Sequence, residues 1–226
     1  MRKMTMKTNT GLVEYAKAQL GLPYWYGTFG NIATADLYDS KRRQYPALYK
    51  PWNDFPSQYG KRVHDCVGLI KGYLWSDSAT SKPIYNASQD VSANGMRSKC
   101  SEKGAIGTMP DIPGVLVFMP GHVGVYIGGG KVVEARGHEY GVVCTELSKR
   151  PWKHWGKCPW INYSSAPGGK TITVKTGTWN VRKGAGKQYD VKGYVNGGTK
   201  LVYSKINDGW YYIPQLDGWV SAKGVM

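Results

Sequence analysis

The stretch His64-Asp65-Cys66-Val67-Gly68-Leu69-Ile70 decides how the first part of this chain folds. A cysteine stands directly before an apolar run, and the run continues through Tyr73 and Leu74 with helical spacing. Asp65 is a favourable N-terminal capping residue, so the pattern predicts a buried helix with Cys66 in its first turn. Backbone N–H groups and the helix dipole at that position favour a thiolate, which predicts a lowered thiol pKa. An ordinary buried cysteine is the alternative interpretation of the same stretch, because free cysteine is among the most buried residue types.

On either side of this stretch the sequence indicates two further helices and one long excursion. Apolar spacing over residues 10–20 predicts a first helix that is capped by Thr10 and stopped by Gly21. Residues 28–62 are polar and aromatic without a sustained period, which indicates a long excursion with short helical pieces that forms one wall of a cleft. Residues 88–99 favour another short helix.

In the middle of the chain the spacing of apolar residues changes from a helical to a strand-like pattern, which predicts an antiparallel sheet. Residues 115–119 are continuously apolar, and apolar side chains alternate with other residues through 122–128. A glycine turn leads into a third strand over 131–135, and a fourth follows over 141–146. Short connections between consecutive strands indicate an antiparallel meander. Helices followed by such a sheet make the fold class α+β.

A histidine and a carboxylate on this sheet are candidates to act with Cys66. His122 begins the second strand, and packing of the cysteine helix on the sheet would bring the imidazole beside the thiol, as an activated nucleophile requires. The histidine then needs a third group to hold its ring, and the returning third strand places Glu134 opposite the start of the second. His138 is the rival for this role, but its position beyond the strand carries it past the site. A solvated histidine and a surface carboxylate paired with Arg136 are the alternative interpretations.

The composition changes again toward the C-terminus. Three tryptophans that include Trp152 are expected to pack the end of the first domain, and residues 164–170 then have linker composition. Residues 171–226 alternate short strands with glycine and Asn/Asp turns and contain no His or Cys. This pattern predicts a small all-β barrel or sandwich that binds rather than catalyses. The expected organisation is a catalytic domain over 1–163, a linker over 164–170 and a binding domain over 171–226.

Four motifs together resemble the NlpC/P60 family of cell-wall cysteine peptidases. They are Gly21-x-Pro23-Tyr24-x-x-Gly27, Asp65-Cys66-x-Gly68-Leu69, Pro113-Gly114-x-Leu116-Val117-Phe118, and His122-Val123-Gly124-Val125-Tyr126-Ile127-Gly128 followed by Glu134-Ala135. The resemblance covers about residues 10–163 and implies a papain-like α+β fold. It implies that Cys66 is the nucleophile, that His122 is its acid–base partner and that Glu134 orients the imidazole. It also implies that the Tyr24 hydroxyl joins the Cys66 backbone N–H in stabilising an oxyanion.

This sequence departs from the family pattern in three places. Val67 stands where many members have serine, and Glu134 occupies a position that is often histidine. Residues 28–62 form a longer segment than simple members have.

The C-terminal part resembles a bacterial SH3 (SH3b) domain. The motifs that carry this resemblance are Thr178-Trp179-Asn180-Val181-Arg182-Lys183-Gly184-Ala185-Gly186, Gly209-Trp210-Tyr211 and Gly218-Trp219-Val220. Such domains imply binding to the cell wall. The combination of a catalytic domain with this tail is similar to a phage endolysin.

The resemblance implies a peptidoglycan hydrolase that cleaves an amide bond of the stem peptide through a thioester. The expected target is the bond between γ-D-glutamate and the diamino acid. An N-acetylmuramoyl-L-alanine amidase on the same fold is the alternative, and a non-catalytic cell-wall-binding protein with an inert Cys66 is the alternative of another class.

Charge narrows the expected partners. Thirty Lys and Arg against fifteen Asp and Glu give a net charge of +15, and a basic surface attracts polyanions. With the resemblance, the expected partners are peptidoglycan and anionic wall polymers. The run Lys41-Arg42-Arg43 is interpreted as a solvated loop or helix face, and neither nucleic-acid binding nor membrane insertion is expected. The basic stretch 1–7 lacks a following apolar region, so we expect no signal peptide, synthesis in the host cytoplasm and action on the wall after release.

The cysteines give little evidence of a metal or a disulfide framework. Cys66, Cys100, Cys144 and Cys158 are scattered and form no CxxC pair. A zinc site built from Cys144, His154 and Cys158 is the minority interpretation, because their spacing fits no common pattern. The expected mechanism requires neither a metal nor another cofactor.

Overall fold

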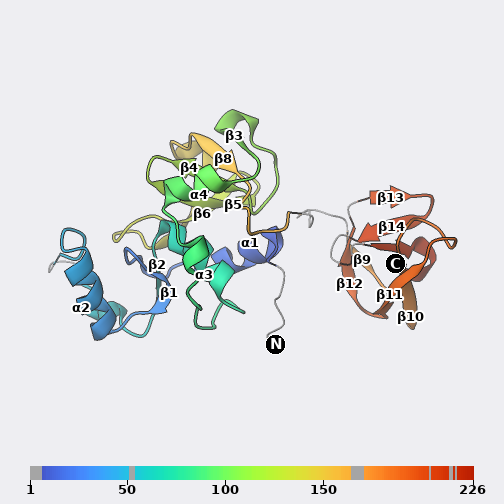
Figure 1. Ribbon diagram of the computed structural model, residues 1–226, viewed down its shortest axis with the longest axis horizontal. Coiled ribbons are helices and arrows are strands. Elements are labelled where there is room, and N and C mark those ends of the chain that lie inside the picture. The colour runs from blue at the N-terminus through green and yellow to red at the C-terminus, as the bar shows by residue number, and fades with distance from the viewer. Residues whose placement is uncertain (1–6, 51–53, 164–170, 204, 214–215, 217) are drawn as a thin grey trace. The chain divides into compact units, whose positions relative to one another are not determined.

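The computed structural model describes residues 7–50, 54–163, 171–203, 205–213, 216 and 218–226, and it divides the chain into two compact units (Figure 1). Unit 1 comprises Met1–Asn162 and unit 2 comprises Tyr163–Met226. The predicted linker, residues 164–170, lies outside the described residues, and the exact domain limits stay a prediction.

The α-helices described in unit 1 all begin at a side-chain cap. The α-helices are α1 (Asn9–Ala18), α2 (Ala35–Gln44), α3 (Cys66–Trp75) and α4 (Ala93–Lys99). Their N-caps are Thr8, Thr34, Asp65 and Ser92, and each side chain accepts a hydrogen bond from the backbone N–H three residues later. The predicted cap of α3 is therefore confirmed. The predicted cap of α1 is wrong by two residues, because Thr8 rather than Thr10 receives the Gly11 N–H.

A six-stranded antiparallel sheet forms the other half of unit 1, with the strand order β3-β8-β4-β5-β6-β7. Its strands are β3 (Lys103–Ala105), β4 (Leu116–Met119), β5 (His122–Gly128), β6 (Lys131–Ala135), β7 (Val142–Glu146) and β8 (His154–Gly156). The predicted meander is confirmed as β4–β7. The strands β3 and β8 extend the sheet beyond β4, and the sequence pattern did not indicate them.

The sheet is covered differently on its two faces. Helices α1 and α3 pack against β5 and β6, and Leu69 and Ile70 of α3 are fully buried, as are Val123 and Val125 of β5 (Figure 1). A smaller apolar cluster lies around Val117, Tyr126, Val132 and Trp152. The mixed helical and antiparallel architecture agrees with the predicted α+β class.

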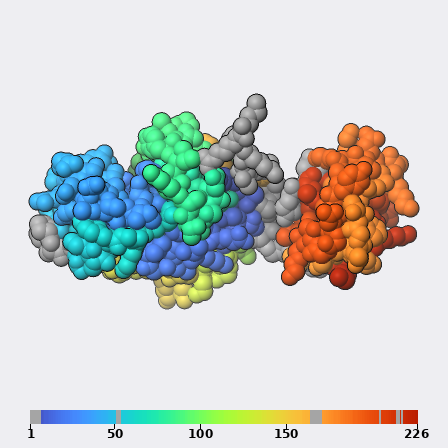
Figure 2. Space-filling model, turned by 90° about the horizontal axis from the view of Figure 1, so that it is seen from below, coloured from blue at the N-terminus to red at the C-terminus, as the bar shows by residue number. Residues whose placement is uncertain are grey.

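Residues 28–64 have more structure than the sequence indicated. Strands β1 (Phe29–Ile32) and β2 (Arg62–His64) pair antiparallel, and α2 lies between them in the sequence. An aromatic cluster around the buried rings of Trp25, Tyr49 and Phe55 anchors this segment. In the space-filling view the segment forms one end of unit 1, in light blue (Figure 2). The short helical pieces that were expected are one ten-residue helix and one 3-10 turn.

Unit 2 is an all-β structure with an apolar core. Its strands are β9 (Thr171–Thr173), β10 (Thr178–Arg182), β11 (Val191–Asn196), β12 (Lys200–Val202), β13 (Lys205–Asn207), β14 (Trp210–Ile213) and β15 (Gly218–Ser221). They form a five-stranded sheet, β11-β10-β15-β14-β13, and a two-stranded sheet, β12-β9. The buried side chains include Val181, Leu201, Ile213 and Val220. The SH3-like closure of these strands into a barrel stays a prediction.

Short 3-10 helices complete the described secondary structure. They are Pro56–Gln58, Ala87–Gln89, Ile106–Thr108, Leu147–Lys149 and Ala222–Gly224. Within the described ranges, no helix has the length and apolar character that crossing a bilayer requires.

Candidate active site

The first turn of α3 presents Cys66 beside a carboxylate that has two backbone partners. Asp65 Oδ1 accepts the Gly68 N–H at 2.6 Å, and Oδ2 accepts the Gly27 N–H at 2.8 Å. Gly27 has a φ of +75°, a conformation that favours glycine, so the turn before β1 depends on this residue. Asp65 thus starts the helix and also ties it to the turn that follows Tyr24.

The sulfur of Cys66 lies against the backbone on both sides of His122. The thiol donates toward the carbonyl oxygen of Gly121 at 3.9 Å. The backbone N–H groups of Val123, Val67 and Cys66 also interact with the sulfur. The structure therefore brings the predicted nucleophile to the start of β5.

The acidity of this thiol differs from the sequence-based prediction. Burial raises the pKa of Cys66 to about 12, and the negative charge of Asp65 acts in the same direction. The surrounding N–H groups oppose this shift, but desolvation of the thiolate outweighs them. The predicted lowering of the thiol pKa is therefore wrong, and a base must take the proton when the sulfur attacks.

The imidazole of His122 is held by a fully buried carboxylate. His122 Nε2 lies 2.7 Å from Oε2 of Glu134, and Glu134 has no exposed surface. The register of β5 and β6 pairs Val125 with Val133, and its continuation places Glu134 diagonally across from His122. The structure thus contains the contact that the returning third strand predicted.

Three donors converge on Glu134. In addition to the contact with His122, Oε1 accepts hydrogen bonds from Thr145 Oγ1 at 2.7 Å and Arg150 Nε at 2.9 Å, and Oε2 accepts one from Arg150 Nη2 at 3.0 Å. Burial by itself would raise the pKa of Glu134, but the hydrogen bonds from His122, Arg150 and Thr145 lower it to about 2. Glu134 is therefore a carboxylate at neutral pH. A paired arginine makes its complete burial possible.

A tryptophan fixes the plane of the imidazole. The rings of His122 and Trp152 stack with centroids 5.6 Å apart and an interplanar angle of 13°. A Cβ atom on Gly124 would come within 3.0 Å of Trp152 and 2.5 Å of Val132. Gly124 is thus the residue that lets the indole approach the strand beside His122.

Tyr24 and His138 occupy different surroundings. Burial raises the pKa of the Tyr24 hydroxyl, and the neighbouring charges of Cys66 and Asp65 raise it further, so this group stays a hydrogen-bond donor. The ring of His138 packs against Phe55 with centroids 4.5 Å apart. Glu134, rather than His138, is the group in contact with His122.

Sequence reasoning missed two of the residues that build this site and gave a third only a packing role. Thr145 lies on the predicted fourth strand, and nothing in the sequence indicated that its hydroxyl would bind Glu134. Arg150 is one of thirty basic residues, and nothing in the pattern distinguished it. Trp152 does pack in the core as expected, but its contact with His122 depends on the tertiary structure.

The zinc interpretation fails in the folded chain. His154 lies on β8 and Cys144 on β7, and three strands separate these two in the sheet. Cys144 is exposed, whereas Cys158 is buried. Across the described ranges, no group of three His, Cys, Asp or Glu side chains is arranged to hold a metal ion.

Residues 55–160 match the NlpC/P60 family. This chain contains an NlpC/P60 family domain. The domain includes Cys66, His122 and Glu134, whereas Tyr24 and helix α2 precede it. No curated protein gives a significant match to the sequence.

Several solved structures are similar to the chain at low identity. NlpC1 from Trichomonas vaginalis has 15% identity and a TM-score of 0.42 over 71% of this chain and 48% of its own. RipB, a peptidoglycan hydrolase from Mycobacterium tuberculosis, has 19% identity and a TM-score of 0.37 over 69% of this chain and 67% of its own. Ly7917 has 15% identity and a TM-score of 0.30 over 95% of this chain and 92% of its own. The chain spans about half the length of NlpC1 and of NlpC2 from the same organism.

Proposed function

We propose that this protein is a peptidoglycan hydrolase in which Cys66, His122 and Glu134 cleave an amide bond of the stem peptide. The observation that carries the proposal is that the sulfur of Cys66 lies against the backbone on both sides of His122, whose ring is held by Glu134. The family match over residues 55–160 supports the same chemistry.

The first half of the reaction forms a thioester. The thiol of Cys66 is protonated at neutral pH, so His122 takes its proton as the sulfur attacks the carbonyl carbon. The C–N bond then breaks, and the imidazolium returns that proton to the leaving amine. In the second half, His122 takes a proton from water, whose oxygen attacks the thioester carbonyl, and then protonates the departing thiolate.

The oxyanion of each tetrahedral intermediate needs hydrogen-bond donors. The N–H of Cys66 belongs to the first turn of α3, where helix geometry leaves N–H groups without an intrahelical acceptor. The hydroxyl of Tyr24 keeps its proton beside Cys66, so we assign it as the second donor. Glu134 keeps Nε2 of His122 protonated and leaves Nδ1 for the thiol.

We assign the bond between γ-D-glutamate and the diamino acid as the target. An N-acetylmuramoyl-L-alanine amidase would use the same thioester chemistry and is the second candidate. We further propose that unit 2 is an SH3b-like module that binds the wall, that the protein acts on the wall after release from the cell that makes it, and that it works as an endolysin does. The net charge of +15 supports attraction to anionic wall polymers.

A digest of purified peptidoglycan tests the proposal. The full-length protein and its Cys66→Ala variant are incubated with walls of several types, and the soluble fragments are identified by mass spectrometry. We expect dipeptides that remain linked to glycan, and none from the variant. The Cys144→Ala variant is the matched control, because Cys144 is exposed on β7 and should not affect the digest.

Other products lead to other conclusions. Free stem peptides that depend on Cys66 would make the protein an amidase. Fragments that the Cys66→Ala variant releases equally well would remove the thiol mechanism. Retention of the variant on walls that it does not digest would separate binding from catalysis.

A further inference from the structure

A cleft of about 450 Å³ opens between α2 and the first turn of α3, the turn that carries Cys66. Asp65, Val67 and Gly68, the neighbours of Cys66 in the first turn of α3, lie on one wall. Lys41, Gln44 and Tyr45 line the opposite wall, on and just after α2. Its volume is within the range of about 300–1,000 Å³ that is usual for small-molecule sites. Cys66 stands between Asp65 and Val67 in the sequence, so the cleft shares the first turn of α3 with the nucleophile.

The opposite wall is formed by residues that lie outside the segment matched to the NlpC/P60 family. The match with the NlpC/P60 family begins at residue 55, and α2 ends at Gln44. Helix α2 is held in place by the packing of Leu37, Tyr38 and Tyr45 against the aromatic cluster. The packing of α2 therefore fixes the backbone from which Lys41 and Gln44 reach the cleft.

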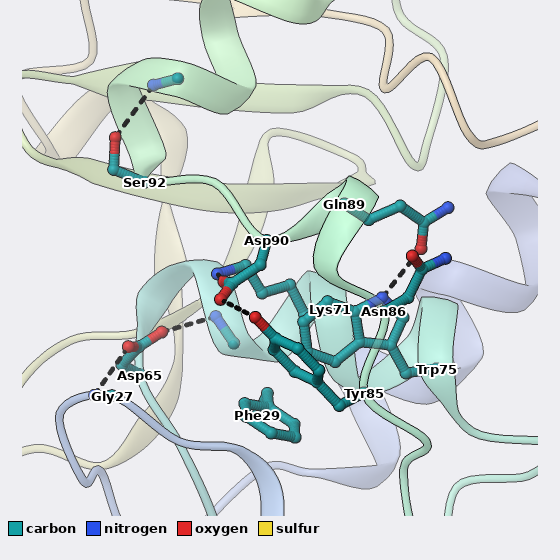
Figure 3. Close-up of polar contacts among 12 residues, drawn as sticks. Gly27, Phe29, Asp65, Lys71, Trp75, Tyr85, Asn86, Gln89, Asp90 and Ser92 are labelled. Carbon is teal, nitrogen blue, oxygen red and sulfur yellow. Dashed lines mark hydrogen bonds and ion pairs between the residues drawn. The ribbon is translucent and has the colours of Figure 1, made fainter.

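Most charges in the cleft already have partners. Lys71 forms an ion pair with Asp90, and the Tyr85 hydroxyl donates to the same carboxylate at 2.9 Å (Figure 3). Asp65 accepts the N–H groups of Gly27 and Gly68, and Figure 3 shows the contact with Gly27. Asp65, Lys71 and Asp90 together carry one net negative charge, and each of them is already hydrogen-bonded within the protein.

Lys41 is the exception. Its ammonium donates to the neutral Oε1 of Gln44 at 3.2 Å and lies 5.7 Å from the centre of the Tyr45 ring. No carboxylate in the described part of the chain forms an ion pair with it. Burial lowers the pKa of Lys41, and the charges of Asp65 and Asp90 oppose that shift. The ammonium thus lies in the field of Asp65 and Asp90 without a direct ion pair, and its N–H groups other than the one on Gln44 can bind an anionic group of a ligand.

We propose that this cleft is a subsite in which Lys41 binds the α-carboxylate of the γ-linked glutamyl residue of the substrate. This subsite rests on the proposed function and extends it to a discrimination between stem peptides. In the γ-D-glutamyl linkage the α-carboxyl group is outside the peptide chain, and walls carry it either as a free acid or as an amide. The ammonium of Lys41 attracts the acid more strongly than the neutral amide, so the enzyme prefers stems with free carboxylates.

Matched synthetic peptides test the subsite. The substrates are L-Ala-γ-D-Glu tripeptides with the α-carboxylate free or amidated, each prepared with L-Lys and with meso-diaminopimelate. The Lys41→Gln variant should lose about tenfold in kcat/KM on the free acid and change less than twofold on the amide. Lys41→Arg should keep most of the preference, because it keeps the charge.

The neighbouring residue provides a control on the same helix. Arg42→Gln removes the same charge from an exposed position that does not line the cleft, so neither substrate should be affected. An equal effect of Lys41→Gln on acid and amide, or no effect, would overturn the subsite and leave the hydrolase assignment intact. If wild type cleaves none of the four peptides, the endopeptidase assignment fails and the subsite fails with it.

Discussion

Among the residues that the structure describes, unit 1 buries nine polar or charged side chains, whereas the buried side chains of unit 2 are apolar. The buried set in unit 1 includes Asp65 and Glu134, which the candidate site uses, and Lys71, which lines the adjacent cleft. Each of these three has a hydrogen-bonded partner. Burial of such groups costs free energy unless partners compensate, so a chain retains them where they perform chemistry or hold a structure in register. The contrast agrees with the proposal that unit 1 catalyses and that unit 2 binds the wall.

Removal of the imidazole should give the largest effect. His122→Ala is expected to lower kcat on a soluble stem peptide by about 10²–10⁴-fold, because the protonated thiol then has no base. His154→Ala is the control, since His154 lies on β8, which β4 separates from the His122 strand β5 in the sheet. Steady-state kinetics on the full-length variants measure both. Equal losses in the two variants would show that His122 has no special part.

Replacement of the orienting carboxylate should have the next largest effect. Glu134→Gln keeps the shape of the side chain but removes the charge that faces His122 and Arg150, and we expect kcat to fall about 10²-fold. The same kinetic assay measures this loss. Unchanged kcat would mean that Trp152 alone is enough to hold the imidazole.

Alkylation should report the raised thiol pKa. In a Cys144→Ser background, the rate at which iodoacetamide modifies Cys66 should rise about tenfold per pH unit, or about 10²-fold from pH 7 to pH 9, because only the thiolate reacts. A pKa of about 12 places this whole range below the midpoint. A plateau below pH 8 would instead mean that His122 holds Cys66 as a thiolate.

A substitution that opens a cavity in the core of unit 2 should lower the stability of that unit without changing the activity that we assign to unit 1. Ile213 is fully buried, and Ile213→Ala is expected to lower the free energy of unfolding of unit 2 by about 3 kcal/mol. Calorimetry measures this change, and kcat/KM on a soluble stem peptide should stay at the wild-type value. Ile206→Ala, at an exposed position on β13, should change stability by about 0.5 kcal/mol or less. Parallel loss of activity with Ile213→Ala would contradict the division of roles.

The free energy of unfolding should depend on pH in the acid range because Glu134 is a buried carboxylate. Because the folded-state pKa of Glu134 is lowered from 4.5 to about 2, its contribution is present above pH 4.5 and is lost as the pH falls toward 2. Urea unfolding of wild type and Glu134→Gln at several pH values should therefore give a stability difference that narrows over this interval. A difference that stays constant from pH 6 to pH 2 would count against an ionised Glu134.

The elements that sequence reasoning located correctly carry local signals. Asp65 before an apolar run predicted α3 and its cap, and alternation with glycine turns predicted β4–β7. The contact between His122 and Glu134 could be predicted because a short turn sets the register of adjacent strands. The predicted cap of α1 was Thr10, whereas the structure has Thr8 in this position. The two threonines are close in sequence and offer nearly the same local capping signal.

The sequence by itself determined the helix that carries Cys66, the meander, and the pairing of His122 with Glu134, because periodicity, caps and tight turns act over a few residues. Only the tertiary structure decided that Arg150 and Thr145 converge on Glu134, and that α2 brings Lys41 to the cleft at the first turn of α3. It also decided the sign of the thiol pKa shift, which the local helix dipole predicted wrongly. Desolvation and ion pairing depend on everything that packs around a group, and residues distant in sequence supply most of those neighbours.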